Sequence, residues 1–318
     1  MKRYRWNDIG DDARRQYLDS RSAFSAREEA LKERLEVRGS MKWRAINGTE
    51  YLIRVSTTGS QTSIGPRSET TEAVYNKFVT KREDLDARLF DLNKSLERHQ
   101  RMNRALFVGR APKLLVNILN RLEKEGLADY FTVVGTHALY CYEAAAGVVF
   151  NEADVMETRD IDLMFDVRKR LSFVTHMGRL DTTLLKILKK EDSTFKIRTD
   201  QLLTAVNSQG FEVDIIRRET KGGDPHPLRL TDDDDELFAV PANNAGILLD
   251  GPRFSAMIVA TTGHMARMQT ISPVAFSRFK RWLAEQPDRE VMKRRRDRLQ
   301  AELVEELVEE YLPQLSML

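Results

Sequence analysis

The chain has 318 residues, and its 51 lysines and arginines nearly balance its 49 aspartates and glutamates, giving a formal net charge of +2 at pH 7. This length allows two or three domains, and the near-neutral balance does not by itself indicate a nucleic-acid partner. A single cysteine, Cys141, excludes an intrachain disulfide and a cysteine-based zinc site. No apolar run reaches the length of a membrane span, and the N-terminus has no apolar signal segment, so we expect a cytoplasmic location.

The N-terminal region is predicted to contain a helix followed by a β-hairpin. Residues 11–36 have apolar side chains that recur every seven positions, as on one face of a helix: Tyr17, Phe24 and Leu31. Residues 42–46 and 49–55 then flank Asn47-Gly48, a pair that favours a two-residue hairpin turn. The hairpin carries two aromatic side chains, Trp43 and Tyr51. We expect both in the core, although a basic and aromatic hairpin can also contact an RNA or DNA strand.

A second long helix is predicted to begin after Ser68, which is a suitable N-cap residue. Its apolar positions follow a heptad-like spacing: Phe78, Leu85, Leu89, Leu92 and Leu96. This helix can pair antiparallel with the helix of residues 11–36, or the two can form the seam of a homodimer. Both arrangements agree with the sequence.

A strand, a tight turn and a helix are predicted next. Pro112 starts a helix over residues 114–127, and the β-branched and aromatic residues 130–134 then favour a strand. Gly135-Thr136 ends this strand, and residues 137–146 have a helical pattern. The arrangement places free backbone N–H groups and the positive end of a helix dipole where a phosphate can bind.

Residues 158–166 are predicted to form a strand with two carboxylates, Asp160 and Asp162, on one face, because alternate side chains of a strand point the same way. Like charges this close repel one another unless a positive group lies between them, and a divalent metal ion is the commonest such group. The alternative interpretation is a polar strand edge with two solvated aspartates.

Residues 210–217 form a further predicted strand, whose polar face carries Glu212 and Asp214. A third carboxylate on a neighbouring strand would complete a two-metal site. The order of these pieces, Val-Val-Gly-Thr, then Asp-Ile-Asp, then Val-Asp-Ile-Ile, resembles the polymerase-β-like nucleotidyltransferase superfamily. The resemblance implies an α+β nucleotidyltransferase fold, a mixed sheet with flanking helices, and a nucleoside triphosphate donor.

Carried over residue by residue, the resemblance implies that Gly135 and Thr136 hold the triphosphate. Asp160 and Asp162 would bind two Mg²⁺ ions, or Mn²⁺, and Asp214 would be the third carboxylate, which also binds metal and helps to activate the attacking hydroxyl. Thr136 stands where the superfamily usually has Ser or Gly, and it keeps the hydroxyl. The gap from Gly135 to Asp160 is longer than usual, and its excess residues, 147–157, are expected to add a strand and loop beside the site.

Further stretches carry a narrower resemblance. Residues 158–163 are similar to the motif of the AbiEii-type abortive-infection toxins. Together with residues 63–68, 279–282 and 293–301, they look like a bacterial family known only for a nucleotidyltransferase fold, and this likeness covers most of residues 40–312. It implies a fold and a chemistry, and no particular substrate.

Between the two carboxylate strands and beyond them, shorter elements are predicted. Helices are expected over residues 180–190 and 199–206, and short strands over residues 195–197 and 247–249. The acidic run of residues 232–236 is expected to be a solvated loop, because it has no strand register that would fix the geometry of a metal site.

The C-terminal part is predicted to be two helices, over residues 274–285 and 288–311. It is the most basic part of the chain, with Arg278, Lys280, Lys293, Arg294, Arg295, Arg296 and Arg298. One interpretation is a solvated face with helix-pairing charges. In the other, Lys280 and Lys293 reach the triphosphate, while the arginine run binds an acidic acceptor such as RNA.

Three parts are therefore expected: an N-terminal module of helix, hairpin and long helix (residues 1–110), a catalytic domain (111–270) and a C-terminal helical region (271–318). The predicted activity moves a nucleoside monophosphate from a nucleoside triphosphate to a hydroxyl of an RNA (tRNA-like) or protein acceptor, with release of pyrophosphate. Two alternatives remain: a toxin of a toxin-antitoxin or phage-defence system that uses the same chemistry, or a non-catalytic scaffold that binds nucleotides or nucleic acid.

Overall fold

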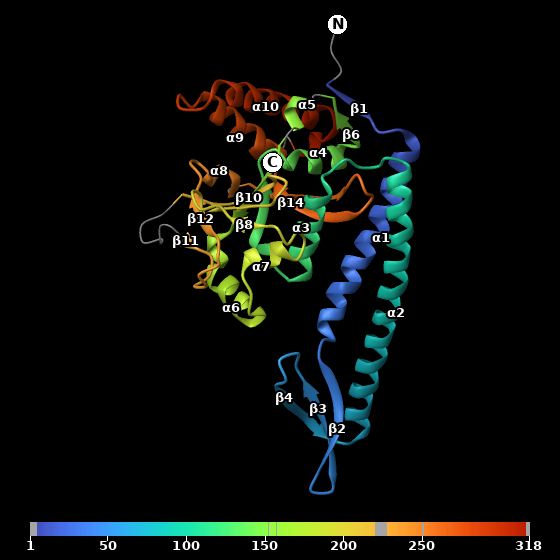
Figure 1. Ribbon diagram of the computed structural model, residues 1–318. Helices are drawn as coiled ribbons and strands as arrows, with labels where there is room; N and C mark the ends of the chain where they lie inside the picture. Colours follow the sequence, from blue (N-terminus) through green and yellow to red (C-terminus); the bar gives the residue numbers. More distant parts are fainter. Residues whose placement is uncertain (1–4, 152, 157, 220–227, 250, 316–318) are drawn as a thin grey trace. The chain divides into compact units, whose positions relative to one another are not determined.

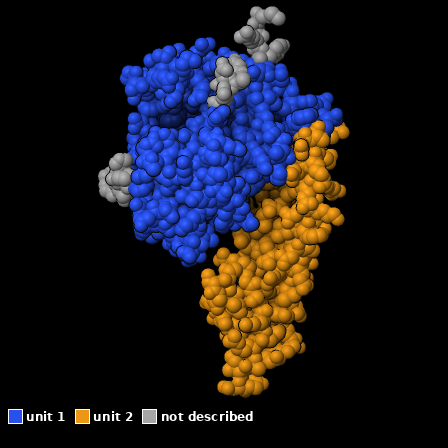
Figure 2. Space-filling view, viewed as in Figure 1, with its two compact units in different colours: residues 1–14, 106–318 blue, residues 15–105 orange. Residues whose placement is uncertain are grey.

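The computed structural model describes residues 5–151, 153–156, 158–219, 228–249 and 251–315. The chain forms two compact units (Figure 2), one of residues 15–105 and the other of residues 1–14 together with 106–318. Among the described helices, none combines the length and the apolar character that a membrane span requires.

The unit of residues 15–105 is built on two long helices that run antiparallel, α1 (Asp11–Glu36) and α2 (Glu69–Ala105) (Figure 1). Residues early in α1 contact residues late in α2, and the reverse, through Gln16 with Asn103, Arg27 with Asn93, and Arg34 with Asp86. Of the two arrangements that the sequence left open, the structure has the antiparallel pair within one chain. The Ser68 hydroxyl caps α2 as expected, since it accepts a hydrogen bond from the backbone N–H of Thr71 over 3.3 Å.

A three-stranded antiparallel sheet belongs to the same unit: β2 (Ser40–Ile46), β3 (Thr49–Val55) and β4 (Gln61–Pro66). The predicted hairpin turn is confirmed, because Asn47 and Gly48 have φ of 50° and 81°. β4 had not been predicted.

The expectation that Trp43 and Tyr51 lie in the core was wrong. Both are only half-buried, and Leu52 and Ile53 of β3 are the buried residues of this sheet. The Trp43 ring packs against Tyr75, with ring centroids 5.8 Å apart. A small sheet supported by one helix buries its aliphatic side chains fully, whereas larger rings stay partly exposed at its margin.

The larger unit contains a mixed sheet with nine strands among the described residues: β5 (Phe131–Val134), β7 (Asp160–Phe165), β8 (Lys196–Ile197), β9 (Thr204–Val206), β10 (Glu212–Arg217), β11 (Leu228–Arg229), β12 (Phe238–Pro241), β13 (Arg253–Val259) and β14 (Met265–Ile271). Its order is β11-β12-β10-β7-β5-β14-β13, and the β8–β9 pair joins the sheet through β9 and β10. β10 is parallel to β7 and β12, while β5 is antiparallel to β7. The expected mixed sheet of an α+β protein is confirmed.

The helices of this unit are α3 (Lys113–Lys124), α4 (Ala138–Ala146), α5 (Ala153–Met156), α6 (Arg170–Leu180), α7 (Leu184–Lys189), α8 (Gly246–Leu249), α9 (Pro273–Glu285) and α10 (Val291–Tyr311), with short 3-10 turns η1 (Ala128–Tyr130), η2 (Val167–Lys169) and η3 (Pro313–Leu315). The two C-terminal helices agree with the prediction, and they pack against each other (Figure 1). The side chain of Ser272 caps α9 by accepting a hydrogen bond from the N–H of Ala275.

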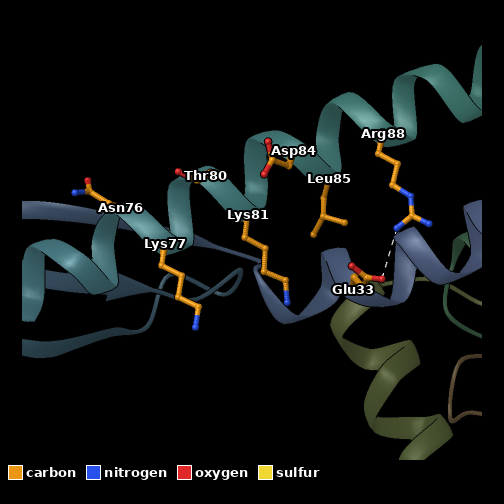
Figure 3. Close-up of a pocket in the computed structure, with 8 residues that line it drawn as sticks. All are labelled: Glu33, Asn76, Lys77, Thr80, Lys81, Asp84, Leu85 and Arg88. Carbon is orange, nitrogen blue, oxygen red and sulfur yellow. Dashed lines mark ion pairs between the residues drawn. The ribbon is translucent and has the colours of Figure 1, made fainter.

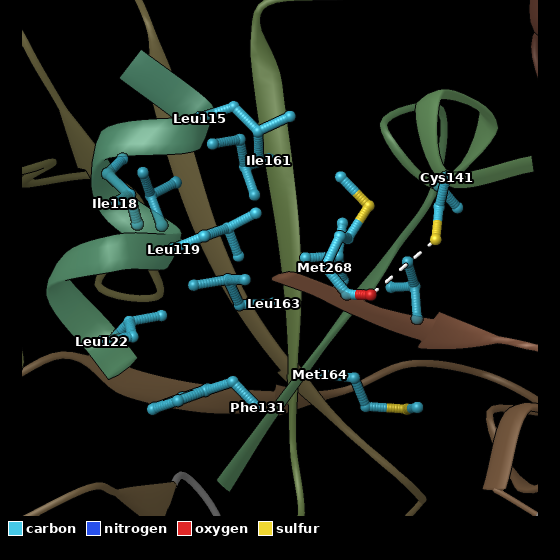
Figure 4. Packing of buried hydrophobic residues seen from close by; sticks show 14 of the residues in the cluster. Leu115, Ile118, Leu119, Leu122, Phe131, Cys141, Ile161, Leu163, Met164 and Met268 are labelled. Carbon is cyan, nitrogen blue, oxygen red and sulfur yellow. Dashed lines mark hydrogen bonds between the residues drawn. The ribbon is translucent and has the colours of Figure 1, made fainter. Parts of the chain in front are cut away.

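Helices cover both faces of the sheet near β7 (Figure 4). Leu115 and Leu119 of α3 lie beside Ile161 and Leu163 of β7 on one face, while Cys141 of α4 lies with Met268 of β14 on the other. Because α3 buries the apolar side of β7, the alternation of the strand directs its aspartates toward the side of α4.

The excess residues between the turn and β7 do add a strand, as expected. β6 (Val148–Phe150) pairs antiparallel with β1 (Trp6–Asp8), and the short helix α5 follows. Glu152 and Glu157 of this stretch lie outside the described residues.

Two predictions of secondary structure were wrong. Residues 199–206 do not form a helix, because Thr204–Val206 is strand β9 and pairs antiparallel with β10. Residues 247–249 belong to the helical turn α8 and not to a strand. The hairpin of β13 and β14 had not been predicted. β9, β13 and β14 are strands through their pairing with a neighbouring strand, so the pattern within each segment did not identify them.

The prediction that the acidic run of residues 232–236 is a solvated loop holds for only part of the run. Residues 232–235 are exposed, but Glu236 is buried, with 1% of its surface accessible. Its carboxylate accepts hydrogen bonds from the N–H of Leu184 at the start of α7 and from the hydroxyl of Thr231. A carboxylate at a helix N-terminus stabilises the unpaired N–H groups there.

Candidate active site

Three carboxylates from two neighbouring strands meet on one face of the main sheet. Asp160 and Asp162 come from β7, and the parallel register of β7 and β10 places Asp214 beside Asp162. One oxygen of each of the three carboxylates lies within 4.8 Å of the others, so together they can hold a metal ion. The sequence analysis selected all three residues, and the tertiary structure brings them together.

The turn after β5 lies directly against this cluster. Gly135 has a φ of +68°, a conformation that residues with a side chain rarely adopt. A Cβ atom on Gly135 would lie 2.0 Å from Oδ2 of Asp162. Glycine is therefore needed here for two reasons, its backbone conformation and the close approach of the Asp162 carboxylate.

Burial and mutual repulsion raise the pKa values of two carboxylates in the cluster. Burial, and then the charges of Asp160 and Asp214, raise the pKa of Asp162 to about 7. The pKa of Asp214 is also raised, mainly by burial, although the Thr204 hydroxyl donates a hydrogen bond to its Oδ1 over 2.5 Å and opposes this shift. The Thr158 hydroxyl donates to Oδ1 of Asp160.

A group of charges from α9, α10 and the loop between them lies within electrostatic range of Asp162. Nζ of Lys280 lies 2.8 Å from Oδ1 of Asp297, and Nε of Arg289 donates to Oδ2 of the same carboxylate over 2.9 Å. The positive charges of Lys280 and Arg289 act to lower the pKa of Asp162. Burial lowers the pKa of Lys280, despite the opposing charges of Asp297 and Asp162.

The first residues after the glycine are held by hydrogen bonds. The Thr136 side chain is buried, and its Oγ1 accepts a hydrogen bond from Nε2 of Gln300 over 3.2 Å. His137 is fully buried, and its Nδ1 donates to the backbone carbonyl of Asp160 over 2.9 Å. Burial lowers the pKa of His137 to about 4, so the ring is neutral at pH 7 and ties α4 to β7.

Lys293, the second lysine selected from the sequence, lies elsewhere on α10. Its side chain is more than half exposed, and its Nζ lies 3.6 Å from Glu290, the residue just before the helix. Of the two lysines, Lys280 is the one whose charge acts on Asp162. Glu212 lies beside Asp160 in the register, but its Oε1 accepts from Arg198 over 2.9 Å.

Sequence reasoning missed Thr204, Asp297 and Gln300. Thr204 was hidden by the wrong helix prediction over residues 199–206, although Thr204 and Val206 are β-branched residues, which are typical of a strand. Asp297 and Gln300 are separated by three positions on α10, a spacing that places both on one helix face. The spacing alone does not indicate whether this face of α10 is buried or exposed.

The donor set fits a hard divalent cation. All three groups are carboxylates, and Mg²⁺ and Mn²⁺ prefer oxygen ligands of this kind. The raised pKa values of Asp162 and Asp214 reflect the cost of gathering negative charge in a partly buried place, and a bound cation removes that cost. The polar neighbours Thr158 and Thr204 orient two of the three carboxylates.

The α+β fold of the larger unit gathers three carboxylates beside a glycine turn. The chain belongs to the nucleotidyltransferase family, because a family model with the description "Nucleotidyltransferase" matches residues 113–317, which is well over half of its length. Comparison with curated proteins gave no match, and neither did comparison with solved structures.

Proposed function

We propose that this protein is a metal-dependent nucleotidyltransferase of the polymerase-β-like superfamily, and that its larger unit has that fold. It transfers a nucleoside monophosphate from a nucleoside triphosphate to a hydroxyl group of an RNA or protein acceptor. The observation that carries the proposal is the register of β7 and β10, which sets Asp214 beside Asp162 with Asp160 on the same face. Gathering three carboxylates costs folding free energy because they repel one another, and a bound cation offsets that repulsion.

In this proposal Asp160, Asp162 and Asp214 hold Mg²⁺, or Mn²⁺. The cation supplies positive charge to the phosphates and lowers the pKa of the acceptor hydroxyl. Asp214 accepts the proton of that hydroxyl, a role that suits a carboxylate at the edge of the cluster that would hold the cation. The acceptor oxygen forms a bond to the α-phosphorus, the bond from that phosphorus to the bridging oxygen breaks, and pyrophosphate leaves.

The triphosphate is held by the turn after β5. The backbone N–H groups at Gly135 and Thr136 lie at the start of α4, where the helix dipole favours an anion. The hydrogen bond from Gln300 to Thr136 fixes the turn. Lys280 adds a positive charge close to Asp162, which favours the binding of phosphate. Lys293 is exposed and can reach solvent-facing phosphate oxygens only by leaving Glu290.

The test is transfer of label from each of the four α-labelled ribonucleotides, with Mg²⁺ or Mn²⁺, to total cellular RNA and protein. We expect label in one macromolecular fraction, which identifies the donor base and the acceptor class together. Asp160→Asn and Asp214→Asn should each abolish transfer and leave the circular dichroism spectrum unchanged.

Glu212→Gln is the matched control, because Glu212 lies on the same strand and face as Asp214 but is held by Arg198. This variant should keep its transfer activity. Full activity in Asp160→Asn, or the absence of label in every fraction with the unmutated protein, would contradict the proposal.

A further inference from the structure

A groove with three arginines runs between the C-terminal helices of the larger unit. Its volume is about 540 Å³, and Ala284 of α9 and Val291 of α10 contribute apolar surface to it. Arg294, Arg295 and Arg298 of α10 line the same groove. We call this surface the arginine groove.

The charges of the arginine groove are not neutralised within the part of the chain that the structure describes. Four other basic side chains of these helices and the loop between them have carboxylate partners: Lys280 and Arg289 with Asp297, Arg281 with Glu305, and Lys293 with Glu290. Arg278 of α9 has no described carboxylate within 4 Å, but it does not line the groove. No described carboxylate lies within 4 Å of the guanidinium groups of Arg294, Arg295 or Arg298. The one acidic residue of the groove, Glu302, already lies 3.6 Å from Arg5.

A groove of similar volume in the unit of residues 15–105 shows the contrast. It measures about 570 Å³ and also contains basic side chains (Figure 3). There Arg88 pairs with Glu33 of the same groove, and Lys81 pairs with Glu36. Charges that are paired in this way need no ligand, whereas three like charges that share one groove repel one another and attract an anion.

The arginine groove is continuous with the buried charges near the carboxylates. On α9, Ala284 lies one turn beyond Lys280, and on α10, Arg294 lies three residues before Asp297. The groove and the Lys280–Asp297 pair are therefore successive layers between the same two helices. The Lys280–Asp297 pair, one turn along α9 from Ala284, carries the lysine whose charge acts on Asp162.

We propose that the arginine groove binds the phosphates of a polynucleotide strand, and that this strand is the acceptor. Guanidinium groups bind phosphate oxygens through paired hydrogen bonds, and a strand presents one phosphate per nucleotide to successive arginines. The apolar surface of Val291, 69% exposed, can lie against a sugar or base. That the strand is the acceptor rests on the proposed nucleotidyl transfer, whereas the binding itself does not.

The test is fluorescence anisotropy with a labelled single-stranded RNA and a DNA of the same sequence, measured with the full chain over a series of salt concentrations. The triple variant Arg294→Gln, Arg295→Gln, Arg298→Gln should weaken binding at low salt at least tenfold. Its plot of log affinity against log salt should lose a slope of about 2, since each phosphate contact contributes about 0.7 for a single strand. Arg281→Gln is the matched control, because Arg281 is an exposed arginine of α9 that pairs with Glu305, and its slope should not change.

An affinity for either strand that is lower in the triple variant supports the proposal. The strand that the unmutated protein binds with the higher affinity identifies RNA or DNA as the ligand. Equal binding by the triple variant and the unmutated protein would overturn the proposal. Binding of a poly-glutamate peptide with no binding of either strand would also overturn it, in favour of an acidic protein acceptor.

Asp160→Asn separates this proposal from the proposed function. The variant should bind the strand as the unmutated protein does, because Asp160 does not line the groove. If the unmutated protein binds the strand through the three arginines but transfers no label, the proposed nucleotidyl transfer is wrong and the proposed strand binding is supported. If label reaches RNA equally well in the triple variant and in the unmutated protein, the proposed acceptor binding by the arginine groove is wrong and the proposed transfer is supported.

Discussion

Gly135 lies so close to Asp162 that a single methyl group on Gly135 would come within 2.0 Å of the Asp162 carboxylate. This contact joins the turn after β5 to the carboxylate cluster, so the group that would hold phosphate and the group that would hold metal cannot move independently. The backbone of Gly135 adds its own constraint, with φ of +68°.

Gly135→Ala should therefore abolish transfer activity and destabilise the protein. Gly210→Ala is the matched control, because Gly210 has a similar φ of +74° but open space where its Cβ would lie. Both variants carry the cost of a left-handed conformation, about 1–2 kcal/mol. Only Gly135→Ala should also lose activity and show the larger fall in the urea midpoint. Equal behaviour of the two variants would mean that the contact with Asp162 is unimportant.

The raised pKa of Asp162 predicts a stability that depends on pH. Its value of about 7 in the folded protein exceeds the value of about 3.9 for an aspartate in an unfolded chain. Ionised Asp162 therefore destabilises the metal-free protein. This cost is absent below about pH 4, grows between about pH 4 and pH 7, and is complete above that range.

Asp162→Asn should accordingly raise the melting temperature of the metal-free protein at about pH 8, and this gain should disappear toward about pH 4. Each kcal/mol of repulsion removed corresponds to about 2–4 °C. Addition of Mg²⁺ at the higher pH should stabilise the unmutated protein more than the variant. A gain of the same size at both ends of the pH range would show that the charge of Asp162 does not cause it.

Thr204→Val should weaken metal binding without unfolding the protein. Its hydroxyl donates to Oδ1 of Asp214, and it both orients that carboxylate and opposes the rise of its pKa. Loss of such a supporting hydrogen bond typically lowers metal affinity about 10–100-fold.

Calorimetric titration with Mn²⁺ measures the effect of Thr204→Val, and Thr270→Val is the control. Thr270 is equally buried, but its hydroxyl donates to the backbone carbonyl of Val133. Thr270→Val should lose stability and keep its Mn²⁺ affinity. An unchanged Mn²⁺ affinity in Thr204→Val would show that the Thr204 hydroxyl does not support metal binding.

Asp297→Asn should be strongly destabilising, because Asp297 is fully buried and neutralises both Lys280 and Arg289. Removing one partner of a buried ion pair typically costs about 3–5 kcal/mol. Glu305→Gln is the matched control, since Glu305 pairs with Arg281 at the surface, where a pair contributes about 1 kcal/mol or less. Urea unfolding at pH 7 compares the two, and a similar small cost for both would mean that Lys280 finds another partner.

Local sequence pattern was sufficient wherever an element carries its own signal. Asn47-Gly48 specifies a hairpin turn through its positive φ angles, and Ser68 marks the start of a long helix. The alternation in residues 160–165 indicates a strand with its aspartates on one face, because side-chain direction in a strand has a period of two.

Local pattern failed where an element exists only through its partner. Thr204–Val206 is a strand because β10 completes its hydrogen bonds, and β13 and β14 stabilise each other in the same way. Trp43 was expected in the core, yet it is only half-buried. The burial of its side chain depends on how much of the small sheet is covered by α2. Side-chain burial and strand pairing are properties of the surrounding fold, and propensity is a weak guide to either.

The sequence by itself determined which residues are chemically able to form the site, namely Asp160, Asp162, Asp214 and the glycine turn, because residue type, spacing and strand period are local properties. Only the tertiary structure decided that Asp214 stands beside Asp162, that Lys280 is buried against Asp297 while Lys293 is exposed, and that three arginines share one groove. The physical reason is that these relationships arise from strand register and helix packing between segments far apart in the chain, and both are set by the burial of the whole core.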